Sequence, residues 1–164
     1  MFFIRTATAA DAGAIRELLV ASWRKTYVAV HGADKVEPVI ARWHTLDAVK
    51  ANIEARHGEM LVADNGAELG GMAFAILSDD RKSVQLKQLY VHPAHLRKGI
   101  GRELFAEIET CFPGAETLEL EVDRKNGAAV AFYAAHGMEI CGETVCCGGD
   151  SDIPAFLMSK PLAG

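Results

Sequence analysis

The chain has 164 residues, of which 50% are hydrophobic, and a formal net charge of −5. A chain of this length can bury one substantial core, so we expect a single domain over residues 1–164. The acidic balance argues against a nucleic-acid partner, and the longest apolar stretches are too short to span a membrane. The N-terminus lacks the charged and apolar regions of a signal peptide, so a cytoplasmic location is the default expectation.

Two apolar stretches in the first half of the chain flank the turn dipeptide Asn65-Gly66. They run from Glu59 to Asn65 and from Glu68 to Ser78, and the dipeptide between them predicts a β-hairpin. From Val84 to Val91 the residues are apolar, aromatic or β-branched often enough for a buried strand. A proline and two glycines follow, so this strand must stop near His92.

A helix is expected to begin at the glycine-bearing turn after this strand. Apolar residues recur there at helical spacing, with glutamates on the other side: Ile100, Leu104, Phe105, Ile108 and Phe112 against Glu103, Glu107 and Glu109. The free N–H groups of a first helical turn favour an anion, and glycines let a phosphate approach the backbone. Between Ser83 and Arg102 there is no acidic residue, but there are four basic ones, which favours a polyanionic ligand.

Two other phosphate-binding loops do not fit these residues. No G-x-x-x-x-G-K-[ST] run occurs, and a dinucleotide fingerprint needs a small residue where Leu104 stands. A second strand-to-helix unit follows instead. Residues 118–123 alternate as a strand does, Asn126 is a good N-cap, and Gly137 suits the left-handed position after a helix.

The sequence V-x-P, K-G-I-G and a helix, followed by L-x-V, N-x-x-A and F-Y-x-x-x-G, resembles the GCN5-related N-acetyltransferase (GNAT) superfamily. Members transfer acetyl from acetyl-coenzyme A (acetyl-CoA) to an amine. The resemblance implies an α/β fold with a mixed, mostly antiparallel sheet of six or seven strands, flanked by helices. That sheet would be splayed between the strand ending near Val91 and the strand at 117–122, and acetyl-CoA would enter there.

The resemblance extends to both ends of the chain. Residues 5–12 and the apolar positions after them look like the family's first strand and first amphipathic helix, the latter with Ile15, Leu18 and Leu19. Strands at about 139–146 and 152–158 would complete the sheet and leave a homodimer possible. The final segment, residues 148–161, is similar to the end of bacterial polyamine acetyltransferases.

The resemblance also implies the coenzyme-binding residues. The backbone of Leu89, Tyr90 and Val91 would lie along the pantetheine arm, and Asn126 would contact that arm besides capping its helix. The loop residues expected around the pyrophosphate are Arg97, Lys98, Gly99, Ile100, Gly101 and Arg102. Leu96 stands where the family usually has Gln or Arg, so Arg97 or Lys98 could supply the missing contact.

Tyr133 stands where many family members carry the tyrosine that protonates the coenzyme thiolate; alternatively it packs a helix face beside Phe132. For the general base we expect Glu121 or Glu119, which alternate onto one face of their strand, with a chain of waters as the competing answer. No serine or cysteine has a recognisable nucleophile setting, so direct attack by the amine is favoured over an acetyl-enzyme.

The acceptor is expected to bind aromatic residues after the first helix and on the central strand. The segment between the first helix and the hairpin carries Trp23, Tyr27, His31, Glu37, Trp43 and His44, and aromatic rings and acidic groups hold a cationic amine. The candidates are Trp23, Tyr27 and Tyr90. Core or lid packing is the alternative for these rings and the favoured one for Trp43. A small polyamine ranks first as acceptor, then a protein or peptide amino group, then an amino acid or antibiotic amine. A non-catalytic acetyl-CoA sensor is the alternative of a different class.

Metal chemistry is not expected. The four cysteines, Cys111, Cys141, Cys146 and Cys147, form no C-x-x-C pair and have no matching histidine spacing. They are interpreted as small hydrophobic residues with free thiols. His136, one turn after Tyr133, is expected on the exposed surface of its helix.

Overall fold

A computed structural model describes residues 1–145 and 153–162, in which seven strands form one open sheet in the order β1-β2-β3-β4-β5-β7-β6. The strands are β1 (Phe3–Thr6), β2 (Gly58–Asp64), β3 (Leu69–Leu77), β4 (Ser83–Val91), β5 (Thr117–Asp123), β6 (Glu139–Val145) and β7 (Pro154–Pro161). The helices are α1 (Ala12–His31), α2 (Ala33–Trp43), α3 (Leu46–Ile53), α4 (Ile100–Thr110) and α5 (Gly127–Ala135), with short 3-10 turns η1 (Ala9–Asp11) and η2 (Pro93–His95). Neighbouring strands pair antiparallel except β4 and β5, so the predicted mixed, mostly antiparallel sheet is confirmed.

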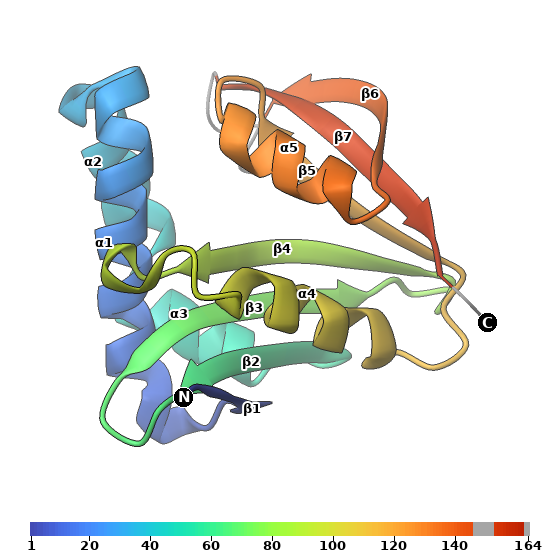
Figure 1. Cartoon of the computed structure of the whole chain (residues 1–164), viewed down its shortest axis with the longest axis horizontal. Coiled ribbons are helices and arrows are strands. Elements are labelled where there is room, and N and C mark those ends of the chain that lie inside the picture. The colour runs from blue at the N-terminus through green and yellow to red at the C-terminus, as the bar shows by residue number, and fades with distance from the viewer. Residues whose placement is uncertain (146–152, 163–164) are drawn as a thin grey trace.

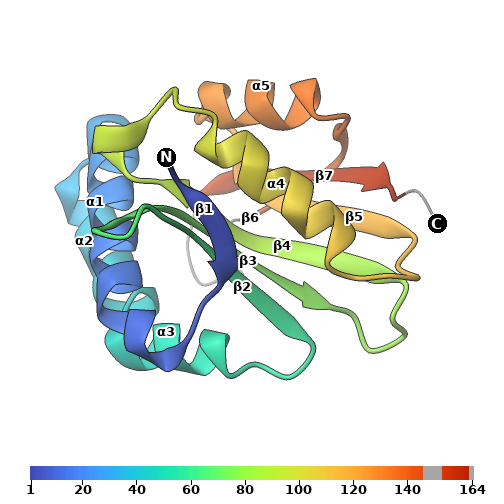
Figure 2. The ribbon, with the colours of Figure 1, turned by 60° about the horizontal axis from the view of Figure 1, so that its bottom comes forward.

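Helices cover both faces of the sheet, α4 and α5 on one and α1 and α3 on the other (Figure 2). Each face has its own buried cluster, one built around Phe105 and Leu118 under α4 and one around Ile15 and Met72 under α1. The close approach of α4 to β3 depends on Gly71. A Cβ added there would lie 2.7 Å from Cγ2 of Ile100, so a larger residue would push the helix away.

The sheet opens between β4 and β5. Their parallel pairing runs only from Ser83 opposite Thr117 to Leu86 opposite Leu120. Beyond these residues the strands separate, and Figure 1 shows β4 diverging from the β5 and β7 half toward the side where α1 and α2 stand. The expected splay is therefore present, and its open end faces the first two helices.

A β-bulge lies at the point where this splay begins. Phe74 pairs with Gln88 whereas Ala75 pairs with Leu86, so Lys87 is an extra residue in β4. Successive residues of a strand alternate between faces, so one extra residue reverses the alternation of everything after it. Leu86 packs in the core on the α4 side, while Gln88 shares the α1 side with Phe74.

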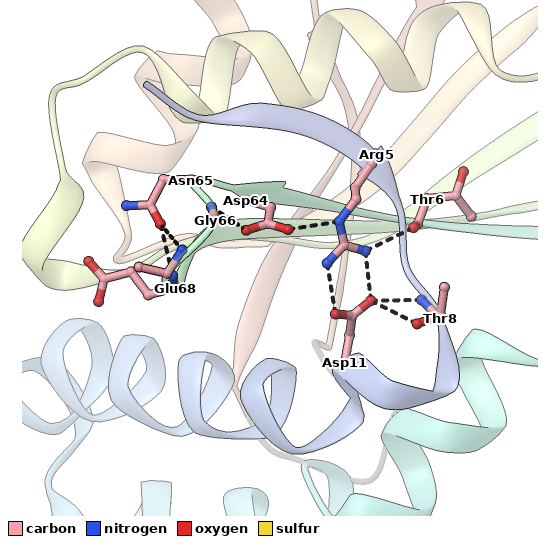
Figure 3. Close-up of polar contacts among 9 residues, drawn as sticks. Arg5, Thr6, Thr8, Asp11, Asp64, Asn65, Gly66 and Glu68 are labelled. Carbon is pink, nitrogen blue, oxygen red and sulfur yellow. Dashed lines mark hydrogen bonds and ion pairs between the residues drawn. The ribbon is translucent and has the colours of Figure 1, made fainter.

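The base of α1 is fixed to the sheet by Arg5 (Figure 3). Its Nε donates to Asp64 Oδ2 at 2.9 Å, and its two terminal nitrogens donate to the carboxylate of Asp11 at 2.8 Å each. The backbone N–H of Thr8 also donates to Asp11. These contacts hold the pKa of Asp11 at about 2 and join β1, β2 and the start of α1.

Most expected elements are confirmed, with small differences at their ends. In the hairpin turn, Asn65 Oδ1 accepts from the N–H groups of Ala67 and Glu68, as Figure 3 shows for Glu68. α4 ends at Thr110, so Phe112 packs on the core from outside the helix. β7 starts at Pro154 and continues to Pro161, whereas Cys146 and Cys147 lie outside the described residues. In the described part of the chain, no helix is both long and apolar enough to cross a membrane.

Candidate active site

A cavity of about 810 Å³ occupies the splay. Its walls come from β4 and β5, from the start of α5, and from α1, the α2–α3 connection and α3 on the other face of the sheet. A second hollow of about 280 Å³ lies beside the loop before α4. Both are lined by Val91, Leu96, Gly101 and Phe132, so they adjoin each other and suit one elongated ligand.

The smaller hollow has the features of a phosphate site. Gly99 caps α4 in the left-handed region at φ 81°, and the first-turn N–H groups of the helix are free by helix geometry. Arg97 and Arg102 line the hollow, but Lys98 does not, because its Nζ reaches His95 Nδ1 at 3.0 Å. Of the two residues expected to compensate for Leu96, Arg97 is the one placed to do so.

The β4 edge beyond Leu86 supplies the next part of the path. Leu89, Tyr90 and Val91 line the large cavity on the side where β4 no longer pairs with β5. The Ser22 hydroxyl donates to the Val91 carbonyl at 3.1 Å and ties α1 to this edge. An unpaired strand edge leading from a phosphate-sized loop fits the amide-bearing pantetheine chain of coenzyme A.

Tyr133 and Asn126 stand on the α5 side of the cavity. The Tyr133 ring packs against Phe105 and Phe132, and burial raises the pKa of Tyr133 well above its usual value near 10, with a smaller contribution from Tyr27. The phenol therefore keeps its proton at neutral pH, as a proton donor requires. Asn126 accepts from the Ala129 N–H at 3.2 Å, which confirms the predicted helix cap.

Both candidate bases line the cavity, at different depths of the splay. Glu119 lies opposite Gln85 where the strands still pair, and it is half-buried. Glu121 lies past Leu120, the last residue of β5 that pairs with β4, and it is exposed. Glu121 is therefore the carboxylate that faces the open part of the splay.

The structure brings together the three aromatic residues proposed for the acceptor. The Trp23 and Tyr27 rings are 4.5 Å apart, and the Trp23 indole N–H donates to the Tyr90 hydroxyl at 3.0 Å. Tyr27 Oη also accepts from Asn126 Nδ2 at 3.4 Å. These rings join α1 to β4 and to the start of α5, and they form one wall of the cavity. We call Trp23, Tyr27 and Tyr90 the aromatic roof.

A buried histidine–carboxylate pair escaped the sequence reasoning as a unit. His31 Nε2 lies 2.6 Å from Asp123 Oδ2, and their side chains are 5% and 2% exposed. The pair connects the end of α1 to the end of β5 across the open side of the splay. Nothing in the sequence links positions so far apart, although each residue was visible as a polar group at an element's end.

His44, which the sequence placed only in the segment expected to bind the acceptor, and Gln88, which it did not single out, are two further residues of the site. Both line the large cavity. His44 is 4% exposed, and neither of its ring nitrogens has a hydrogen-bond partner among the described residues. The same holds for the Oε1 atom of Gln88. Burial lowers the pKa of His44 to about 4, so its imidazole is neutral at physiological pH.

One expectation about a single residue is narrowed and another is wrong. Trp43 is 39% exposed, with the Arg42 guanidinium 5.3 Å from its ring, and it lines the large cavity, so it is not a core residue and lid packing remains the expectation. His136 is half-buried; its ring lies 4.3 Å from that of Phe132, and its Nδ1 lies 2.7 Å from the Phe132 carbonyl oxygen. Packing against the preceding turn of α5 covers it.

The described cysteines and acidic groups form no metal centre. Cys111 is half-buried at the end of α4 and Cys141 is exposed on β6, both as free thiols. Among the described residues, no group of three or more His, Cys, Asp or Glu side chains is arranged to hold a metal ion.

Comparison with known proteins assigns the chain to a family. The model of the acetyltransferase (GNAT) family matches residues 14–138, which is most of the chain. The chain belongs to the GNAT family. A spermidine N(1)-acetyltransferase of Thermoplasma acidophilum is 24% identical over 161 residues, covering 96% of this chain and 95% of that protein. The peptidyl-lysine N-acetyltransferase YiaC of Escherichia coli is 35% identical over 78 residues, covering 47% and 49%.

A solved structure shares the complete fold. The PaiA N-acetyltransferase from Thermoplasma acidophilum, in complex with coenzyme A, superposes with a TM-score of 0.83 at 23% identity, covering 98% of this chain and 99% of that one. The GNAT fold expected from the motifs is confirmed. This GNAT protein is an N-acetyltransferase with acetyl-CoA as its donor.

Proposed function

We propose that this GNAT enzyme transfers acetyl directly to the primary amine of a small molecule, with polyamines as the favoured acceptors. The observation that carries the proposal is the single cavity at the splay. One side of it holds the half-buried Tyr133 and an unpaired strand edge, and the other holds aromatic rings and carboxylates. Donor and acceptor groups can therefore meet in one cavity.

The proposed steps assign one proton transfer to Glu121 and one to Tyr133. Acetyl-CoA supplies the acyl group as a thioester. Glu121 takes a proton from the acceptor ammonium, directly or through water, so that the amine nitrogen can attack. A backbone N–H of residues 89–91 stabilises the negative charge that develops on the carbonyl oxygen. The Tyr133 hydroxyl then donates its proton to the departing sulfur.

Two observations support a small acceptor over a protein segment. The His31–Asp123 pair and the Tyr27–Asn126 contact join α1 to the β5 half of the sheet, so the aromatic roof is fastened on both sides of the splay. The similarity to a spermidine acetyltransferase covers nearly the whole of both chains. The partial identity to YiaC keeps a protein or peptide amino group as the second candidate.

The test is free thiol release from acetyl-CoA with purified protein and a panel of acceptors. The panel contains spermidine, spermine, diamines, lysine and N-terminal peptides, amino acids and aminoglycosides. We expect release with the polyamines and its loss in Tyr133→Phe. Release with peptides alone would establish the second candidate, and coenzyme binding without release for any amine would identify a sensor.

A further inference from the structure

His44 and Gln88 stand at one end of a cavity that crosses the central strand. Its lining runs from β5 and α5, past β4, to Phe74 and Ile76 of β3 and to Ala48 and Asn52 of α3. Strands lie about 4.8 Å apart, so β5 and β3 are separated by about 10 Å. A linear acceptor can therefore reach beyond the place where its amine reacts.

The order of contacts along α1 places His44 away from the reacting end. Tyr27 meets Asn126 at the start of α5, while Trp23, one turn earlier, meets Tyr90 of β4. The His44 ring lies 5.0 Å from the Trp23 ring and directly precedes the cap of α3. Gln88 pairs across the sheet with Phe74 of β3, which lines the same end.

Some polar atoms at this end lack hydrogen-bond partners, and an amine could supply them. Both His44 ring nitrogens and Gln88 Oε1 are buried without partners among the described residues. Buried polar groups are normally satisfied, so two side chains with unsatisfied atoms in the lining of one cavity indicate a ligand. A primary ammonium has three donors and no acceptor, and either tautomer of a neutral imidazole can present it a lone pair. Trp23 adds an aromatic face nearby.

The charges around the cavity agree with this ligand. Glu119, Glu121 and Asp123 line it, Asp123 being paired with His31, and Lys87 is the one basic residue of its described lining. His44 stays neutral at physiological pH because its pKa is about 4, so it does not repel a cation. The cavity thus suits a cationic chain that has a reacting amine at the Glu121 end.

We propose that His44, with Gln88, receives the second amino group of the acceptor, so that the enzyme selects diamines and polyamines over monoamines of equal length. This inference rests on the proposed function. It gives His44 a role in specificity, separate from the proton transfers assigned to Glu121 and Tyr133. Selection would appear in KM, because the distal contact is equally present before and during the chemical step.

The experiment compares putrescine with n-butylamine, which has the same carbon chain and lacks the distal amine. We expect kcat/KM to favour putrescine by at least about tenfold in the wild type. His44→Phe keeps the ring packing on Trp23 and should abolish most of that preference through KM, while His44→Gln restores part of it. Gln88→Leu should act in the same direction.

Controls separate this inference from the proposed function. Arg24→Ala removes an exposed ion pair between α1 and Glu37 of α2, and it should leave the preference unchanged. An unchanged preference in His44→Phe would overturn the inference even if the enzyme acetylates amines. If no small amine supports thiol release, the proposed function fails. Imidazole NMR of the coenzyme-bound protein then decides: a His44 shift with putrescine and none with n-butylamine supports the distal site, and no shift overturns it.

Discussion

The coenzyme side and the acceptor side of the cavity are built in different ways. The coenzyme side comes from two short stretches, residues 89–102 and 126–133, and depends on backbone groups, glycine positions and one phenol. The acceptor side gathers single side chains from α1, the α2–α3 connection, α3, β3, β4 and β5. In the proposed function, local strand-to-helix units hold the donor, whereas tertiary packing alone assembles the pocket for the amine.

That difference separates chemistry from selectivity. A variant on the coenzyme side should change turnover or donor binding with every acceptor. A variant on the acceptor side should change stability or the ranking of acceptors. The variants below test this division, beginning with the largest expected effect.

Tyr133→Phe tests the chemistry assigned to the coenzyme side. Removing the proton donor should lower kcat by about 10²- to 10⁴-fold, because this is the usual contribution of general acid catalysis. The ring still packs on Phe105, so the coenzyme dissociation constant should stay within about twofold. Steady-state kinetics and calorimetry measure the two quantities. Equal losses in both would mean that Tyr133 only packs.

Asp123→Ala tests the connection between α1 and β5. It removes one member of a buried pair and leaves His31 without its partner, so the free energy of unfolding should fall by about 3 kcal/mol. Urea denaturation measures the change. The matched control, Arg24→Ala, breaks an exposed ion pair on the same helix and should cost less than about 1 kcal/mol. Similar costs for both variants would contradict the buried connection.

His44→Phe tests whether the acceptor side carries an unsatisfied buried group. The folded-state pKa of His44 is about 4 against 6.5 when unfolded, so the unfolded chain binds more protons between these values. The wild type should therefore lose about 3 kcal/mol relative to the variant as pH falls from 6.5 to 4. Above pH 6.5 the variant should be at least as stable, since an apolar ring replaces an unpaired polar one. A constant difference across this range would contradict the buried neutral imidazole.

Arg97→Ala and Lys98→Ala test which side chain contributes to the phosphate site. Arg97 lines the hollow whereas Lys98 is directed to His95, so only Arg97→Ala should weaken coenzyme binding. The effect should be about three- to tenfold, as expected for one partly exposed charge beside a backbone-dominated site. Isothermal titration with coenzyme A at low and high salt measures it. If both variants bind as the wild type does, no side chain compensates for Leu96.

The parts that the sequence could predict are those with local causes. The Asn126 cap, the left-handed Gly137 and the period-two pattern of β5 depend on residues close to each other in the chain. The covered His136 was missed because its burial depends on contact with Phe132, one turn earlier, and the apolar α5 gave no clear exposed face.

The acceptor side could be predicted only in part. The aromatic roof was expected because ring types alone suggested it, yet its contacts depend on how α1 lies across the sheet. His44 lies just after α2, where its burial follows from packing against Trp23. The face of Gln88 depends on the Lys87 bulge, and strict alternation from Leu86 would have assigned Gln88 to the wrong side.

The Lys87 bulge also bears on how faithfully the sheet assembles. A strand of uniform alternation can slide by two residues and still bury an apolar face, whereas β4 consists of two segments in opposite phase joined at Lys87. After such a slide, the change of phase at Lys87 would lie at a different position along β3. Gln88 or Lys87 would then face the α4 core in place of a leucine. The irregularity thus makes the observed alignment of β3 and β4 more favourable than its neighbours.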